Sequence, residues 1–471
     1  MAFNSAAFLF LFLPLFLGVY YLTPSRYRNL TLLVESYVFY GWWRPDFLLI
    51  LVGTTVWTYC AGVVMQRDEK RSGLWCAIGV LGCIAVLGIF KYLNFFIDSF
   101  ASLVGTTPNE LGVHWRILFP VGISFYVFHS ISYLVDVKRG HAAPARNIID
   151  FAAFLALFPQ LMAGPILRYK DLAQQFVVRT VSWEKFSDGW MRFLLGLGKK
   201  VLIADNLARV TDMLFALDHP SALEAWLGCG TFLMQVYFDF SGYSAMAIGL
   251  ALMLGFHFDE NFRFPFHARS ISDVWNRWHI SLGSWMFTYV YRPLGGGKRG
   301  GKLRQLTNLF IVSFLGGIWH GANMTFVFWG AWKGIFIVME RGFDWLRRDR
   351  STWYGSIGMI TIMTVGVAMF RAVDFQHGLS IFAGMAGFNG LTIRPEVLVA
   401  TRMESIATCI LAFGIIRYEP RLFALAGFGP DGSVTGTALN WFKAALVLAI
   451  GVASVFEMVD QIHQPFLYYQ F

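Results

Sequence analysis

The stretch LEAWLGCGTFLMQVYFDFSGYSAMAIGLALMLGF, residues 223–256, decides the fold class of this chain. Only Glu224 and Asp239 in it carry a charge. A helix needs ~20 predominantly apolar residues to cross a bilayer, so the stretch predicts a membrane-spanning helix. Asp239 falls near its middle, where an unpaired carboxylate would be costly. We expect Asp239 either to face a polar cavity as a supporting group or to find a partner; a structural link between helices is the alternative.

The rest of the composition agrees with a membrane protein. Of 471 residues, 56% are hydrophobic and 14% are charged, whereas a soluble protein carries roughly 25% charged residues. No polar segment is long enough for a separate soluble domain, so we expect one membrane domain over residues 1–471 with about 11–12 transmembrane helices. The expected spans are 5–23, 29–43, 47–66, 74–104, 116–137, 188–216, 223–256, 305–319, 323–340, 354–371, 402–417 and 440–459.

The charges indicate an orientation in the membrane rather than a nucleic-acid partner. The net charge of +9 comes from short basic clusters between apolar stretches, which is typical of cytoplasmic loops. The loops 105–115 and 217–222 contain no Lys or Arg. Residues 1–22 have no positive leader region, so we expect an uncleaved first helix with its N-terminus outside. Five cysteines show no metal-ligand spacing, and no metal site or permanent cofactor is predicted.

Two stretches look too irregular for plain spans. Residues 151–167, FAAFLALFPQLMAGPIL, contain Pro159, Gly164 and Pro165, and such a break at membrane depth must be surrounded by protein. We therefore expect a re-entrant element. Residues 270–291, SISDVWNRWHISLGSWMFTYVY, show the periodicity of one amphipathic helix, with Ser270 as its cap.

Two histidines are candidates for chemistry. His279 falls on the apolar face of the predicted amphipathic helix, with Asn276 one turn away to orient its imidazole. His320 lies in GGIWHGAN, residues 316–323, at a glycine-rich junction between two apolar segments. A buried neutral imidazole can act as a general base. The alternatives are an incidental histidine on an interfacial helix and a histidine that only joins two helices.

The glycine-rich loop GGGKRGGK, residues 295–302, nearly matches a phosphate-binding loop. Leu303 stands where that loop needs Ser or Thr, and no strand is predicted before it. The basic loop could still hold phosphates through its backbone N–H groups and cations, and an ordinary cytoplasmic loop is the alternative.

Several motifs together resemble the membrane-bound O-acyltransferase (MBOAT) family, and most closely its branch that acetylates bacterial exopolysaccharides of the alginate or cellulose type. The motifs that carry the resemblance are FLFLFLPLFLGVYYL (8–22), RYRNLTLL (26–33), SYVFYGWW (36–43), FPVGISFYVFHSISYLVD (119–136), FPQLMAGPI (158–166), YFDFSGYSAMAIGLALMLGF (237–256), WNRWHISL (275–282) and GGIWHGAN (316–323).

The resemblance implies an all-α polytopic helical disc with re-entrant or interfacial helices and a central tunnel. His320 corresponds to the family's catalytic histidine and His279 to a second active-site position. The supporting or tunnel residues would be Trp275, Trp278, Asn276, Asp239 and Asn323. The donor's phosphates would lie near Arg292, Lys298, Arg299 and Lys302. The sequence FTYVYRPLGGGKRG (287–300) departs here from the acidic RDYLYIPLGG that the resemblance leads us to expect.

The implied function is an O-acetyltransferase of the bacterial inner membrane. Acetyl-CoA is the expected cytoplasmic donor, and a periplasmic acceptor protein and the exopolysaccharide synthesis and secretion machinery are the expected partners. Within this class, D-alanyl transfer or acylation of a lipid or peptide stays open. A transporter or channel for an acetyl donor, and a non-catalytic assembly subunit, are the alternatives from other classes.

Overall fold

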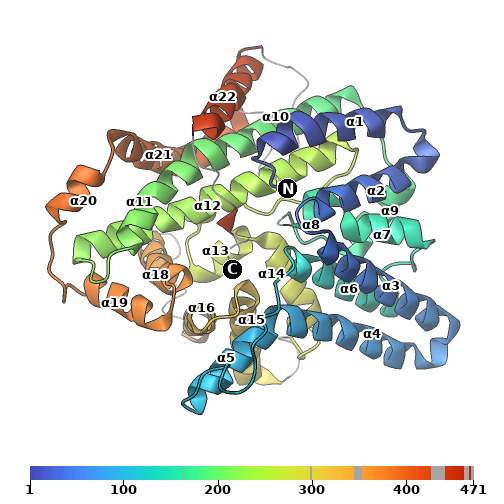
Figure 1. Cartoon of the computed structure of the whole chain (residues 1–471), viewed down its shortest axis with the longest axis horizontal. Coiled ribbons are helices and arrows are strands. Elements are labelled where there is room, and N and C mark those ends of the chain that lie inside the picture. Colours follow the sequence, from blue (N-terminus) through green and yellow to red (C-terminus); the bar gives the residue numbers. More distant parts are fainter. Residues whose placement is uncertain (163, 297–299, 344–352, 426–440, 461–465, 468–471) are drawn as a thin grey trace. The chain divides into compact units, whose positions relative to one another are not determined.

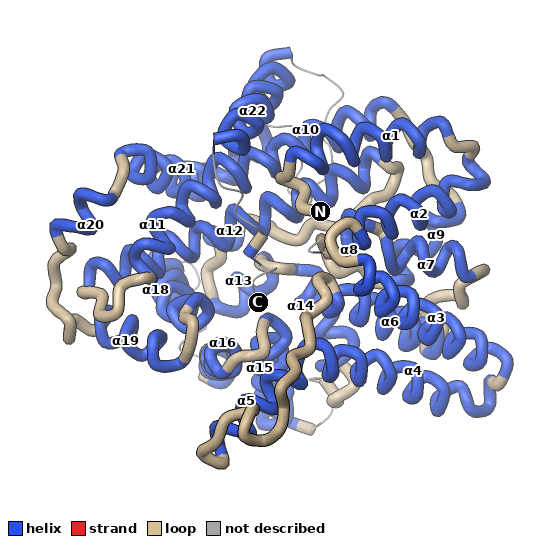
Figure 2. The backbone as a smooth tube through the Cα atoms, viewed as in Figure 1, coloured by secondary structure: helices blue, strands red, loops and turns tan. Residues whose placement is uncertain are grey.

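The computed structural model describes the chain except for residues 163, 297–299, 344–352, 426–440, 461–465 and 468–471. Throughout the described residues the regular elements are helices, joined by loops, and no strand is present (Figures 1 and 2). One isolated antiparallel bridge pairs Phe262 with Trp278. The expected all-helical fold class is confirmed.

The chain divides into two compact units, which we describe separately. Unit 1 comprises Met1–Phe186 and Leu250–Phe258, and unit 2 comprises Ser187–Gly249 and Asp259–Phe471. Two helices belong mainly to unit 2: α10 (Trp183–Gly198) begins in unit 1, and α12 (Ala222–Met253) ends in unit 1. The expectation of a single domain over residues 1–471 stays a prediction.

Unit 1 is built around buried aromatic side chains. Phe158 is fully buried among five other phenylalanine rings, whose centroids lie 4.8–6.2 Å from its own. The elements of this unit are η1 (Ala7–Phe12), α1 (Leu13–Leu22), η2 (Ser25–Tyr27), α2 (Arg28–Gly41), α3 (Pro45–Arg67), η3 (Glu69–Arg71), α4 (Ser72–Leu87), η4 (Gly88–Tyr92), α5 (Leu93–Leu103), α6 (Ile123–Lys138), α7 (Ile148–Ala156), α8 (Phe158–Leu161) and α9 (Tyr169–Val177).

The irregular stretch 151–167 is broken as predicted. The helix α7 ends before Leu157, whose ψ of 106° is not helical, and the short helix α8 begins at the next residue with Pro159 in its first turn. Proline is favoured there because the N–H that it lacks would have no partner within the helix. A Cβ on Gly164 would lie 2.4 Å from the carbonyl oxygen of Pro159, so the chain turns back closely on itself. Re-entry into a membrane stays a prediction.

Unit 2 holds the two candidate histidines. Besides α10 and α12 its elements are η5 (Lys199–Ala204), α11 (Asp205–Phe215), η6 (Pro265–His267), α13 (Ile271–Arg277), α14 (Ile280–Met286), η7 (Phe287–Tyr291), α15 (Gly301–His320), α16 (Met324–Gly342), α18 (Trp353–Arg371), α19 (Phe375–Met385), α20 (Pro395–Ala400), α21 (Met403–Leu425) and α22 (Trp441–Asp460). The helices α15 and α16 touch through their backbones, because a Cβ on Gly317 would lie 2.3 Å from the Cα atom of Gly330.

The helices agree with the predicted membrane spans. Every expected span overlaps a helix. Among the described residues, three helices are both long and apolar enough to cross a bilayer, namely Pro45–Arg67, Glu69–Leu103 and Ala222–Met253. Shorter apolar helices cover Ala7–Leu22 and Gly355–Arg371. The total number of spans stays a prediction.

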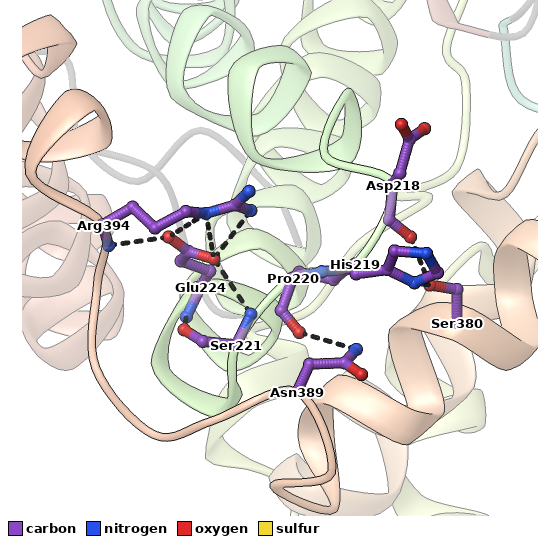
Figure 3. Close-up of polar contacts among 8 residues, drawn as sticks. All are labelled: Asp218, His219, Pro220, Ser221, Glu224, Ser380, Asn389 and Arg394. Carbon is purple, nitrogen blue, oxygen red and sulfur yellow. Dashed lines mark hydrogen bonds and ion pairs between the residues drawn. The ribbon is translucent and has the colours of Figure 1, made fainter.

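An ion pair between the buried Glu224 and the partly exposed Arg394 fixes the N-terminal end of α12 (Figure 3). The carboxylate of Glu224, which has no exposed side-chain surface, accepts hydrogen bonds from the backbone N–H groups of Ser221 and Arg394 at 2.9 Å each. The guanidinium of Arg394 donates to the same carboxylate at 3.0–3.2 Å. Close by, Asn389 donates to the carbonyl oxygen of Pro220. These contacts connect the loop before α12 to the loop between α19 and α20.

Candidate active site

One continuous amphipathic helix was predicted over 270–291, and this is wrong, because the structure breaks it into two short helices. Ser270 caps α13 as expected, since its Oγ accepts a hydrogen bond from the N–H of Asp273 at 3.1 Å. The helix then ends at Arg277, and a second helix, α14, begins at Ile280. Between them His279 adopts a left-handed conformation, with φ 49° and ψ 53°. Periodicity did not reveal the break because both short helices carry apolar residues.

The break turns the imidazole of His279 inward, where Asn261 holds it. His279 is 3% exposed, and its Nδ1 lies 3.2 Å from the Oδ1 of Asn261. The same oxygen accepts a hydrogen bond from the Oγ of Ser281 at 2.8 Å, and the ring of Phe240 meets the imidazole edge-on at 4.6 Å between centroids. Asn276 is exposed and makes no hydrogen bond to His279. The expectation that Asn276 orients the imidazole is therefore wrong.

The surroundings of His279 determine its charge. It lies in the connection between α13 and α14, outside the candidate spans. Burial lowers the pKa of His279 to about 3, and the charge of Lys333 acts in the same direction. The imidazole is therefore neutral near pH 7 and able to give or accept a hydrogen bond.

His320 is the last residue of α15 and lies among aromatic rings. It is 7% exposed, and its imidazole meets the ring of Trp329 edge-on with centroids 5.0 Å apart. The ring of Trp319 lies 5.0 Å from His320 and 5.9 Å from His279 between centroids. One indole thus contacts both histidines, although they are forty-one residues apart in the sequence.

Two cavities meet at these side chains. The larger has a volume of about 450 Å³ and is lined by both histidines together with Asn276, Ser284 and Ser313. The smaller, of about 40 Å³, is lined mostly by apolar side chains. Both are lined by Trp275, Trp278, His320 and Lys333. The structure thus brings five of the predicted site residues to the lining of the larger cavity: His279, His320, Trp275, Trp278 and Asn276.

Asp239 and Asn323 have other partners. Asp239 is 1% exposed and pairs with the buried Lys200, whose Nζ lies 2.5 Å from its Oδ1. The same ammonium bonds Asp205 at 2.7 Å. The expected partner of Asp239 is thus found, and Asp239 lines neither cavity. Asn323 caps α16, since its Oδ1 accepts from the N–H of Thr325 at 3.2 Å, and it too lines neither cavity.

The predicted donor-binding residues lie outside both cavities where they are described. The guanidinium of Arg292 lies 5.1 Å from the ring centre of Phe287. Lys302 donates to the carbonyl oxygen of Gly342 at 2.8 Å and so binds the end of α16. Lys298 and Arg299 lie outside the described residues. Binding of phosphates by this loop stays a prediction.

Asn261 and Lys333 contact or line the site but were not predicted from the sequence. Lys333 is a lone cation in the middle of the predicted span 323–340, and an ionisable side chain at membrane depth is a signal for a functional site. Asn261 carries no such signal in the sequence. Among the described residues no group of three or more His, Cys, Asp or Glu side chains is placed to hold a metal ion, and all five cysteines are free.

Comparison with known proteins gives matches over most or all of the chain. The model of the membrane-bound O-acyltransferase family, MBOAT, matches residues 75–370, which include both histidines. The chain is similar to the probable alginate O-acetylase AlgI of Pseudomonas putida, at 43% identity with 100% of both chains covered. It is also similar to the peptidoglycan O-acetyltransferase of Helicobacter pylori, at 30% identity with 100% of this chain and 97% of the relative covered. The teichoic acid D-alanyltransferase of Bacillus subtilis is 28% identical over 70% of this chain and 83% of its own length.

Proposed function

Because this chain belongs to the membrane-bound O-acyltransferase family, we propose that it acts in exopolysaccharide O-acetylation and passes an acetyl group from a cytoplasmic donor toward a polysaccharide hydroxyl. That it is a membrane-embedded acyltransferase follows from the family. The choice of acetyl rests on the relatives, because five proteins named probable alginate O-acetylase match the whole chain at 39–43% identity. The D-alanyltransferases match less of it, at 25–28% identity.

The observation that carries the catalytic assignment is the position of His320 on the wall shared by two cavities. A hydroxyl acceptor in either cavity would come within reach of its imidazole. A base placed in this way removes the hydroxyl proton as the new ester bond forms, which contributes about 10²–10⁴-fold to a rate. His279, buried and held by Asn261, would orient donor or acceptor from the other end of the Trp319 ring.

The donor and the partners form the finer part of the proposal. Acetyl-CoA supplies the thioester from the cytoplasm, a periplasmic protein accepts the acetyl group, and the exopolysaccharide synthesis and secretion machinery supplies the polymer. The chain lies in the bacterial inner membrane with its N-terminus in the periplasm, because the basic loops then face the cytoplasm.

Ester-linked acetate on the secreted polysaccharide tests the proposal. A deletion strain is complemented with wild type, with His320→Ala or with His377→Ala, and the membrane level of each protein is measured. His377 lines neither cavity and serves as the matched control. We expect wild type and His377→Ala to restore acetate and His320→Ala to leave it at the deletion level. Full acetylation by His320→Ala at equal abundance would remove the histidine from the chemistry.

The same strains separate the other function classes. A transporter would carry acetyl label into inverted vesicles without forming an ester, and would tolerate the loss of His320. An assembly subunit would tolerate the loss of both His320 and His279. Replacing acetyl-CoA by a D-alanyl carrier thioester distinguishes D-alanyl transfer from acetyl transfer.

A further inference from the structure

Lys333 brings a cation to the wall that the two cavities share. It projects from α16, one turn after Trp329, and lines the larger and the smaller cavity together with His320. Its Nζ lies 3.7 Å from the ring centre of Trp275 and 5.7 Å from that of Trp329. The imidazole of His320 packs on the same Trp329 ring. The ammonium and the candidate base therefore both lie within 6 Å of the centre of one indole.

The Lys333 ammonium contacts two aromatic rings. Within the described part of the chain it makes no ion pair and no hydrogen bond to another residue. Two other lysines of unit 2 do have an anionic partner: the partly buried Lys199 pairs with Glu419, and the buried Lys200 pairs with Asp205 and Asp239. The faces of Trp rings attract a cation by ~0.5–2 kcal/mol, which holds the ammonium in place without neutralising it. A cation without a counter-charge beside an apolar cavity is suited to an anion that exists only during the reaction.

We propose that the Nζ of Lys333 donates a hydrogen bond to the carbonyl oxygen of the donor thioester and stabilises the negative charge that develops on it during acyl transfer. This inference rests on the proposed function. It assigns to Lys333 the activation of the donor carbonyl group in the same reaction. The indole of Trp275 holds the ammonium and keeps its position fixed before the donor arrives.

The acceptor oxygen attacks the carbonyl carbon while His320 takes the hydroxyl proton, and the electron pair of the C=O bond moves onto oxygen beside the Lys333 ammonium. When the tetrahedral species collapses, that pair re-forms the C=O bond and the C–S bond breaks. The leaving thiolate takes the proton from the His320 imidazolium. Lys333 remains protonated throughout, and the products are the acetyl ester and the free thiol.

The test uses inverted membrane vesicles of the producing strain, which contain the full chain and its partners. Acetyl-CoA is added at varied concentration, and the release of free CoA thiol gives kcat and KM. We compare Lys333→Met, which keeps the length and loses the charge, with Lys333→Arg, which keeps the charge. Lys91→Met is the matched control, because the Nζ of Lys91 likewise lies over an aromatic ring, 5.4 Å from the centre of Phe119, but in unit 1.

We expect Lys333→Met to lower kcat by about 10²–10³-fold, the usual cost of removing one oxyanion donor, with KM changed less than threefold. Lys333→Arg should retain more of the rate, and Lys91→Met should keep the wild-type kcat. Wild-type kcat in Lys333→Met, or a raised KM with an unchanged kcat, would overturn the inference. The second result would mean that Lys333 only binds an anionic group of the donor.

Chemical rescue distinguishes a folding defect of the variant from the loss of the catalytic ammonium. If Lys333→Met does not reach wild-type membrane levels, Lys333→Ala is assayed with and without methylammonium, per molecule of folded protein. Restored kcat supports the inference and no restoration overturns it. His320→Ala is assayed in parallel. If His320→Ala is inactive while Lys333→Met keeps its kcat, only this inference fails, whereas an active His320→Ala would overturn the proposed function.

Discussion

The Nδ1 atom of His279 lies 3.2 Å from the Oδ1 atom of Asn261, eighteen residues earlier in the chain. The backbone around it is joined to Asn261 as well, since the N–H of Ile280 donates to the Asn261 carbonyl oxygen at 2.9 Å and the N–H of Ser281 to Oδ1 at 3.2 Å. Asn261 itself is fully buried. One asparagine therefore fixes both the ring of His279 and the break between α13 and α14 that turns the ring inward.

Replacing Asn261 with leucine should impair the reaction more than it impairs folding. The substitution keeps the approximate volume and removes the acceptor, so the imidazole loses its orientation. A displacement of about 1 Å at a reacting group can cost ~10²-fold in rate, and we expect a loss of 10–100-fold in vesicle acyl transfer. Asn389→Leu removes a different amide, which bonds Pro220, and should leave kcat unchanged. Equal activity of both variants would show that Asn261 does not position the site.

His279 should make the protein sensitive to acid. Its pKa is lowered to about 3 in the folded protein against ~6.5 in an unfolded chain, so the unfolded state binds the proton more tightly. The contribution to stability is complete above pH 6.5 and falls by about 1.4 kcal/mol per pH unit between pH 6.5 and 3.

His279→Asn should remove that slope, and asparagine tolerates the left-handed backbone at this position. The measurement is the thermal unfolding of detergent-purified protein at pH 7.5, 5.5 and 4.5. We expect the difference in Tm between wild type and His279→Asn to shift in favour of the variant as the pH falls. A difference that does not change with pH would contradict a buried neutral imidazole.

The close contact of α15 and α16 predicts opposite effects for two glycine substitutions. Gly317→Ala places a methyl group 2.3 Å from the Cα atom of Gly330, so the helices must separate, at a cost of about 1–3 kcal/mol. His320 lies one turn after Gly317 in α15. Separation of the helices therefore also changes its distance from Trp329 and Lys333, and activity should fall. Gly230→Ala in α12 has no atom within 4 Å and should be neutral or stabilising by about 0.5–1 kcal/mol. Thermal unfolding and acyl transfer of both variants check the prediction.

Removing Arg394 should loosen the N-terminal end of α12 (Figure 3). In Arg394→Ala the buried carboxylate of Glu224 keeps its two backbone N–H donors and loses the guanidinium. The Arg394 side chain is 44% exposed, so solvent replaces part of the lost interaction, and we expect about 1–3 kcal/mol of destabilisation. Arg44→Ala, which breaks an exposed pair with Asp46, should cost less, because exposed ion pairs contribute little to stability. Comparable losses in the two variants would mean that the Glu224 pair is screened like a surface pair.

The sequence by itself determined the helices and the residues that are candidates for chemistry. Apolar stretches long enough to cross a bilayer are a local property, so every span expected from residues 5–459 overlaps a helix. The break at Pro159 could also be read locally, because proline restricts its own backbone and that of the residue before it. His279 and His320 stood out because an ionisable side chain in an apolar setting is conspicuous in any sequence.

Only the tertiary structure decided how these side chains work together. His279 leaves the helical conformation because Asn261 bonds its ring and the two residues after it, and no periodicity encodes a contact over eighteen residues. Asp239 is paired with Lys200 from another helix. Lys333 and His320 line the same cavities because α15 and α16 pack backbone to backbone at Gly317 and Gly330. Burial in apolar stretches follows from composition, whereas the partner of a buried polar group is set by which helices pack together.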